Sequence, residues 1–198
     1  MNADIIVLAN NDLVFEQECF VDKVIKHYTE DKFDVAGPRI ISLVDGKNQN
    51  PVPVQYKTLK DLDIRIIKYW ILYVLSLVGL DVIVQKKVAK EILEFHPTVG
   101  EDFQLHGACM LFSNEYIRKY DGLFPKTFMY NEEGILKEIV YKNNMNMCYF
   151  DDIEVKHKEG ASTQAMYGKG KKKRQFYYKW NINSCRILKK LKSGAEEF

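Results

Sequence analysis

The sequence is poor in cysteine, and its cysteines are not arranged in pairs. Four cysteines occur in 198 residues, and no two of them form a Cys-x-x-Cys motif: Cys19, Cys109, Cys148 and Cys185. This spacing favours buried or free thiols in a reducing compartment. No cleavable signal peptide precedes the first predicted strand, so the sequence also predicts a cytoplasmic location.

The sequence also lacks an uninterrupted hydrophobic run as long as a transmembrane helix, which needs about 20 residues. The nearest candidate is Leu59–Leu80, in which Tyr69–Leu80 holds only apolar residues, tyrosine, one Ser and one Gly. Charged residues border this run on both sides: Asp61, Asp63, Arg65, Lys68 and Asp81. Three interpretations stay open, namely a buried helix, an interfacial helix and a membrane span, and the flanking charges disfavour the last.

The charge is unevenly distributed along the chain. The net charge is only +2, but Lys156–Lys192 contains twelve basic residues and a single acid, so the remainder is net acidic. Hydrophobic residues make up 46% and charged residues 28%, as in a folded globular chain. We therefore expect a body over residues 1–163 and a basic amphipathic helical tail over 164–198, which would meet an anionic surface or ligand.

The order of predicted elements indicates an α/β fold. Asp4–Ala9 is apolar on both faces, as expected of a central strand in a covered parallel sheet. A helix over Glu16–Tyr28 and a strand over Val35–Ile41 with a Gly-Pro bend follow it. Further helices are predicted over Leu59–Leu80 and Gln85–Phe95.

The second half continues the alternation of strands and helices. Gly107–Phe112 is predicted to be a buried strand, followed by a short helix to Tyr120 that Ser113 or Asn114 caps. An amphipathic helix follows Glu133, with apolar residues facing inward: Ile135, Leu136, Ile139 and Val140. Two short strands, Met147–Phe150 and Ile153–His157, precede the tail helix, whose apolar face would comprise Phe176, Tyr177, Trp180, Ile187, Leu188 and Leu191.

Polar residues follow the first predicted strand directly, as Asn10, Asn11 and Asp12. The carboxyl end of a strand is where open α/β sheets bind ligands. A carboxylate in this place is a suitable ligand for a divalent cation that carries phosphates. The alternative is that Asp12 is simply a turn or cap residue.

Two adjacent carboxylates, Glu132 and Glu133, stand at the predicted start of a helix. They are either favourable partners of the helix dipole or candidates for acid–base chemistry. Aromatic residues precede them at Phe124, Phe128 and Tyr130. A carboxylate against an apolar wall has a raised pKa and can serve as a general base.

Histidines and lysines supply the remaining candidates. His157 ends a predicted strand and is either structural or a ligand of a cation such as Mn²⁺, and His106 is similarly ambiguous. A basic run that includes Lys169 and Lys171 precedes four aromatic residues. Such a run is a solvated face, a membrane-interface segment or a binding site for single-stranded nucleic acid.

Taken in order, these motifs resemble one enzyme family. The motifs are Asn10-Asn11-Asp12, Ala36-Gly37-Pro38-Arg39-Ile40, Gly107-Ala108-Cys109-Met110-Leu111, Gly122-Leu123-Phe124, Phe128 to Glu133, and His157 to Ser162. The chain is similar over positions 4–163 to the family 2 glycosyltransferases with a GT-A fold. The resemblance is to the bacterial rhamnosyltransferase-like members and to those that make capsule or O-antigen.

The resemblance implies an inverting transfer of a sugar from a nucleotide-diphosphate donor to an acceptor hydroxyl, in the synthesis of cell-surface polysaccharide. It implies Asp12 and His157 as ligands of Mn²⁺ or Mg²⁺. It implies Glu133 as catalytic base and Glu132 as an acceptor-site partner or alternative base. The candidates for donor and acceptor binding are Asn10, Asn11, Gly107, Ala108, Lys169 and Lys171.

The chain departs from the family pattern in several ways. Asn10 replaces the first carboxylate of an Asp-x-Asp motif, and Glu133 is one methylene longer than the Asp usual there. Family members have a nucleotide-binding segment before this motif. The resemblance therefore implies a partial GT-A sheet whose nucleotide-binding half comes from a separate chain or a second copy.

The expected partners are a nucleotide-diphosphate sugar and a glycan or lipid-linked acceptor, with peripheral contact at the inner face of the plasma membrane and no nucleic acid. Two alternatives stay open. One is an inactive glycosyltransferase remnant that serves as an interaction module. The other is a nucleic-acid-binding protein that uses the basic aromatic tail.

Overall fold

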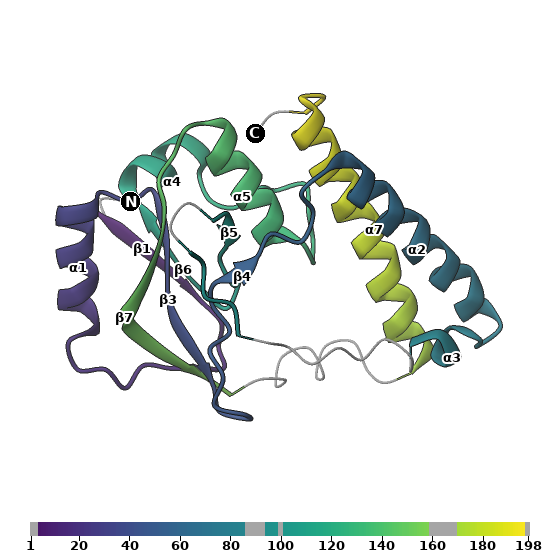
Figure 1. Ribbon diagram of the computed structural model, residues 1–198, viewed down its shortest axis with the longest axis horizontal. Coiled ribbons are helices and arrows are strands. Elements are labelled where there is room, and N and C mark those ends of the chain that lie inside the picture. The colour runs from purple at the N-terminus through teal and green to yellow at the C-terminus, as the bar shows by residue number, and fades with distance from the viewer. Residues whose placement is uncertain (1–3, 86–93, 99–100, 159–169, 197–198) are drawn as a thin grey trace.

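A computed structural model of the chain describes residues 4–85, 94–98, 101–158 and 170–196. Its centre is a five-stranded sheet in the order β1-β6-β3-β7-β2 (Figure 1). The strands are β1 Ile5–Ala9, β6 Cys109–Ser113, β3 Val35–Ser42, β7 Met147–His157 and β2 Leu13–Val14. Strands β3 and β7 run parallel and the other pairs antiparallel. The predicted α/β class with a mixed sheet flanked by helices is confirmed.

The position predicted for the first strand is wrong. β1 is an edge strand that pairs antiparallel with β6, not a central strand of a parallel sheet. Val7 and Leu8 are each 42% exposed. An apolar run predicts an extended strand, but it does not specify which strands pair with it or whether its faces are covered.

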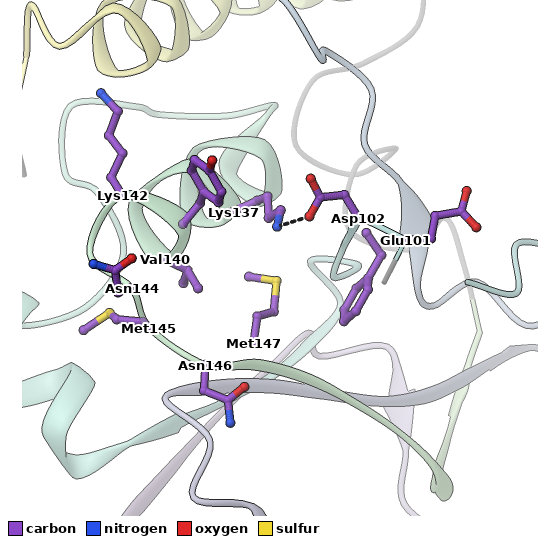
Figure 2. A pocket seen from close by; sticks show the side chains of 11 residues that line it. Glu101, Asp102, Lys137, Val140, Lys142, Asn144, Met145, Asn146 and Met147 are labelled. Atoms are coloured by element: carbon purple, nitrogen blue, oxygen red, sulfur yellow. Dashed lines mark hydrogen bonds and ion pairs between the residues drawn. The ribbon is translucent and has the colours of Figure 1, made fainter. Parts of the chain in front are cut away.

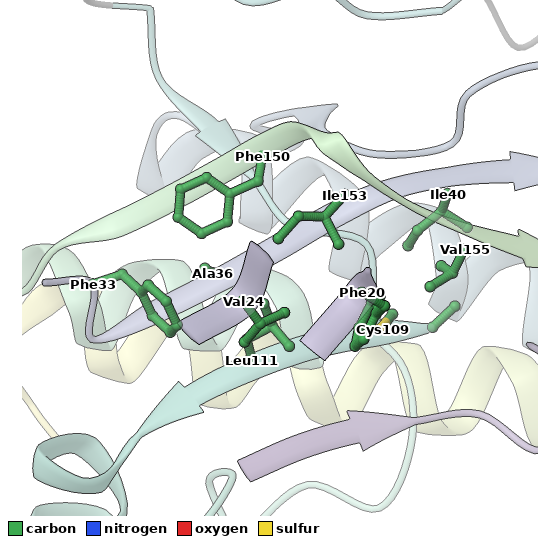
Figure 3. Close-up of a cluster of buried hydrophobic side chains, with 11 residues drawn as sticks. Phe20, Val24, Phe33, Ala36, Ile40, Cys109, Leu111, Phe150, Ile153 and Val155 are labelled. Carbon is green, nitrogen blue, oxygen red and sulfur yellow. The ribbon is translucent and has the colours of Figure 1, made fainter. Parts of the chain in front are cut away.

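Helices cover both faces of the sheet. α1 Phe20–Asp31 packs Phe20 and Val24 on one face, against buried side chains of β3, β6 and β7 (Figure 3). α4 Asn114–Tyr120 and α5 Glu132–Lys142 pack on the other face. β6 lies between these layers, and its alternate residues contribute to the two clusters. This double burial explains its uninterrupted apolar sequence.

Several element boundaries differ from the prediction. α1 begins at Phe20 because Gln17 is held by β7 instead: its side chain donates to Asp152 O and accepts from Glu154 N. The two predicted strands at 147–157 are one strand, β7, with a register shift opposite Pro38 and Arg39. β4 Val52–Pro53 and β5 Phe103–Gln104 form a second small sheet that was not predicted. The helix predicted over Gln85–Phe95 lies almost wholly outside the described residues.

Two long helices, α2 Leu59–Leu77 and α7 Lys171–Ser193, pack side by side next to α5 (Figure 1). α2 starts with a capping box made by Thr58 and Asp61. It ends near Leu77 and is followed by the short α3 Asp81–Gln85. Within the described parts of the chain, no helix combines the length and apolarity needed to cross a membrane.

The buried stripe of α7 differs from the predicted one. Leu188 and Leu191 are buried as expected, whereas Phe176, Tyr177, Trp180 and Ile187 are only half-buried. The residues buried in addition are Tyr178, Asn181, Ile182, Ser184 and Cys185. The stripe is rotated because α7 packs against both α2 and α5. Two polar residues occupy part of it: Asn181 donates to Tyr177 O of α7 itself, and Ser184 donates to Met129 O in the turn before α5.

An ion pair with a buried carboxylate joins the start of α3 to the start of α7. The Asp81 carboxylate is fully buried and accepts hydrogen bonds from Arg174 Nε at 2.6 Å and Nη2 at 3.2 Å. The Tyr178 hydroxyl donates a third bond at 2.9 Å. The Arg174 hydrogen bonds and that of Tyr178 keep the pKa of Asp81 below its ordinary value.

Asp81→Asn should lower the free energy of unfolding by about 2 kcal/mol at pH 7, because a buried charge-assisted pair is broken. A carboxyl with a depressed folded pKa contributes stability above its unfolded pKa of about 3.9 and loses it as the pH falls through the folded value. The difference between wild type and variant should therefore shrink in acid. Urea denaturation across pH measures it.

The exposed Asp151→Asn is the control, and it should change the free energy by less than about 0.5 kcal/mol. An equal loss in both variants, or a loss that persists unchanged in acid, contradicts the role given to Asp81.

Candidate active site

A cleft of about 550 Å³ lies where the ends of β1 and β6 meet the start of α5 and the inner faces of α2 and α7. Its wall is mixed, with aromatic, amide, carboxylate and guanidinium groups. The residues that line it are Leu8, Asn10, Gln55, Tyr56, Arg65, Gln104, His106, Gly107, Ala108, Met110, Leu123, Met129, Tyr130, Asn131, Glu132, Glu133, Tyr177 and Asn181. Apolar walls with a few convergent polar groups are typical of small-molecule sites.

A buried asparagine positions the loop that enters the cleft. Asn50 is fully buried; its Nδ2 donates to Pro38 O at 2.6 Å, and its Oδ1 accepts from the His106 backbone N–H at 2.9 Å. Gly37 is needed beside it, because a Cβ there would lie 2.6 Å from Asn50 Nδ2. The β3 bend is thereby coupled to the conformation of His106 and Gly107.

Gly107 is in direct contact with a predicted catalytic residue. A Cβ added to Gly107 would lie 2.6 Å from Glu133 Oε1, and the Gly107 backbone N–H donates to the same carboxylate. No side chain fits between the loop and the carboxylate. Gly107, which was expected to bind donor or acceptor, lines the cleft and contacts Glu133.

The turn before α5 aims the two glutamates into the cleft. Tyr130 and Asn131 both have positive φ values, 70° and 64°, a conformation that is costly for residues other than glycine. α7 holds this turn, since Ser184 Oγ donates to Met129 O at 2.8 Å and Asn131 Nδ2 contacts Cys185 Sγ. Strain that neighbours maintain is common at functional sites.

Burial changes the acidity of both glutamates. Desolvation raises the pKa of Glu133 above its ordinary value, against its backbone hydrogen bonds, which lower it. Burial also raises the pKa of Glu132, and the charge of Glu133 adds to the effect. Carboxylates with raised pKa values in a cleft are suited to accept a proton.

A second acidic group, Asp12, lies beside His157. β2 pairs with β7 so that Leu13 is opposite His157, and this register places the preceding Asp12 next to the imidazole. Asp12 Oδ1 and His157 Nε2 are 3.3 Å apart, and both side chains are buried. The His106 ring, which lines the cleft, lies 6.1 Å from the His157 ring. The pair is thus close to the cleft wall.

The atoms of this pair fit a divalent cation. His157 Nδ1 lies 2.8 Å from Gln49 Oε1, which can only accept, so in the neutral ring Nε2 directs a lone pair toward Asp12. Asp12 Oδ1 is buried and makes no hydrogen bond within the described part of the chain. No cluster of three or more potential ligands occurs among these residues. A cation held here would need phosphate oxygens or water to complete its shell.

Sequence reasoning missed Arg65 as a cleft residue. Its guanidinium carbon lies 4.7 Å from the centre of the Tyr69 ring and 5.9 Å from that of Tyr56. Its Nε is buried and has no hydrogen-bond partner among the described residues. A desolvated guanidinium between aromatic rings is a site for an anionic group. The position of Arg65 in a predicted helix did not indicate that its side chain lines a cleft.

The remaining predicted residues fall into three groups. Asn10 and Ala108 line the cleft, and Asn10 N–H donates to Ala108 O at 2.9 Å. Asn11 is exposed and does not line the cleft. Lys171 lies at the far end of α2, where it donates to Leu77 O at 2.7 Å, and Lys169 is outside the described residues.

A larger cavity of about 830 Å³ lies between β5, α5 and the start of β7 (Figure 2). Its charged groups include Lys137 and Asp102, which pair with each other at 2.8 Å. None of the predicted site residues that the structure describes lines it. The smaller cleft, where the perturbed carboxylates gather, is therefore the candidate active site.

Comparison with known proteins adds no assignment: neither the models of known protein families nor the curated proteins include a match to this chain. The function has to be argued from the cleft itself.

Glu133→Gln should raise the free energy of unfolding at pH 7. A carboxyl whose folded pKa is raised is penalised in its charged form, so stability decreases as the pH rises from the unfolded pKa, about 4.3, through the folded value. Glutamine mimics the neutral form, and the gain should vanish below about pH 4. Denaturation at several pH values measures it, with the exposed Glu18→Gln as a control that should show no gain. A destabilised Glu133→Gln would contradict the raised pKa.

Proposed function

We propose that this chain is a glycosyltransferase of the family 2, GT-A type, which transfers a sugar from a nucleotide-diphosphate donor to an acceptor hydroxyl with inversion. The observation that carries the proposal is the joint placement of Glu132 and Glu133 in one cleft, with the Asp12–His157 pair beside its wall. A base, and a cation site that can neutralise the departing diphosphate, are two elements that this reaction needs.

Each group of residues has a separate role in the proposed reaction. Glu133 accepts the proton of the acceptor hydroxyl as the oxygen attacks the anomeric carbon, and Glu132 is the alternative base. Asp12 and His157 would hold Mn²⁺ or Mg²⁺, and a cation bound there would neutralise the charge of the departing nucleotide diphosphate. Asn10 and the backbone of Gly107 and Ala108 lie against the donor sugar.

The cleft also favours a class of acceptor. Arg65 is a half-buried cation whose Nε has no hydrogen-bond partner among the described residues, so an acceptor that carries a phosphate or carboxylate would be bound by it. The rings of Tyr56 and Tyr177 offer flat apolar faces nearby. A lipid-linked acceptor with a phosphate next to its sugar has this combination of groups.

Binding of nucleotide diphosphate tests the first half of the proposal. Isothermal titration with UDP and with dTDP should show binding that requires Mn²⁺ and that Asp12→Asn or His157→Gln abolishes, since these residues are the proposed cation ligands. Asp151→Asn, an exposed aspartate, is the matched control and should bind like wild type. Absence of binding at millimolar nucleotide with Mn²⁺ would refute the proposal for this chain.

Gly107→Ala tests the role of Glu133. The new methyl group would collide only with the flexible carboxylate end, so the fold should persist while the base is displaced. Hydrolysis or transfer from UDP- or dTDP-sugars should decrease about 100-fold, as for Glu133→Gln, and the double variant should lose no more than Glu133→Gln alone. Additive losses would show that Gly107 acts independently of Glu133. If Glu133→Gln keeps full activity and Glu132→Gln loses activity, the general base is Glu132.

A further inference from the structure

The side of α2 that faces away from the cleft is apolar and uncovered. Between Ile64 and Val84, eleven large apolar side chains are exposed, with exposed fractions from 36% to 72%. On α2 they recur at intervals of three and four residues, at Ile64, Ile67, Ile71, Val74 and Val78, and so form one stripe. The opposite side of the same helix is buried against α7 or faces the cleft.

The stripe continues onto α3, where Val82, Ile83 and Val84 are also exposed. A contiguous apolar surface of this extent is uncommon on monomeric soluble proteins and marks a place of interaction. A face of this kind can lie on an apolar partner.

The charges around this stripe are of one sign. Between Ile64 and Val84 the only acid is Asp81, which is fully buried in its ion pair with Arg174, and Lys68 is exposed. The acids of the first turn are engaged: Asp61 accepts from Thr58 N, and Asp63 pairs with Lys189. A partner with a negative surface is thus favoured.

A groove with interfacial character borders the stripe. It has a volume of about 550 Å³ and lies between α2 and α7, lined by Trp70, Tyr73 and Trp180 together with Lys179 and Arg186. Tryptophan and tyrosine combined with basic side chains are typical of the boundary between lipid headgroups and acyl chains.

We propose that the α2–α3 face, from Ile64 to Val84, docks on the surface of an anionic phospholipid bilayer, with the apolar stripe inserted at the headgroup level and the basic rim on the lipid phosphates. A second copy of the chain fits less well, because joining two such faces would bring their basic rims together. The surface belongs to the side of α2 opposite Arg65, so docking leaves the cleft accessible.

Vesicle sedimentation tests the proposal. Wild type should bind vesicles of equal parts phosphatidylcholine and phosphatidylglycerol, more weakly at high salt, and should bind pure phosphatidylcholine poorly. Ile67→Glu/Ile71→Glu should reduce binding about 100-fold, because two exposed isoleucines that would insert into the bilayer are exchanged for charges that the lipid repels.

Val21→Glu/Ile25→Glu on α1 is the matched control: it places the same two charges four residues apart on exposed positions of another helix and should bind like wild type. Circular dichroism establishes that both variants are folded. Equal losses in both variants, or no binding of wild type to the anionic vesicles, overturns the proposal. A wild-type dimer that Ile67→Glu/Ile71→Glu dissociates, without vesicle binding, assigns the face to a second copy and likewise overturns it.

Discussion

Burial of β6 on both faces is the constraint on which the rest of the structure depends. Because Cys109 and Leu111 pack toward α1 while Met110 and Phe112 pack toward α4 and α5, one strand joins two hydrophobic layers. The loop before it then has little freedom, and Asn50 fixes it further through the His106 backbone. The candidate base is thus positioned by the core: Glu133 contacts a glycine whose place is set by the strand that follows it.

The sequence could predict the elements whose signals are local. The apolar run of β6, the Ser113 cap of α4 and the inward residues of α5 all lie where periodicity and capping indicated. The central position expected of β1 was wrong, since an apolar strand does not encode its neighbours. The α7 stripe was rotated for a related reason: two helices, α2 and α5, divide its surface between them, and a single periodic pattern represents one contact face.

The candidate site likewise combines residues that local sequence signals predicted with residues whose contacts depend on the fold. Glu132 and Glu133 were predicted from an adjacent pair at a helix start, and they do face one cleft. The contact of Asp12 with His157 depends on the two-residue strand β2, which is too short for any pattern to reveal. Asn50 bonds to Pro38 and His106, which are 12 and 56 residues away, and Arg65 shares the cleft with residues of α5 and α7, so their surroundings become visible only after folding.

The sheet ends at β1 without the features that usually discourage further pairing. Ile5–Ala9 contains no lysine or proline, and its register with β6 has no bulge. Its outer row of backbone N–H and C=O groups is consequently a template on which another extended segment can add. Leu8 and Asn10 line the cleft, so a strand added there would become part of the cleft wall. Growth of the sheet and the shape of the cleft would therefore be coupled through one row of main-chain hydrogen bonds.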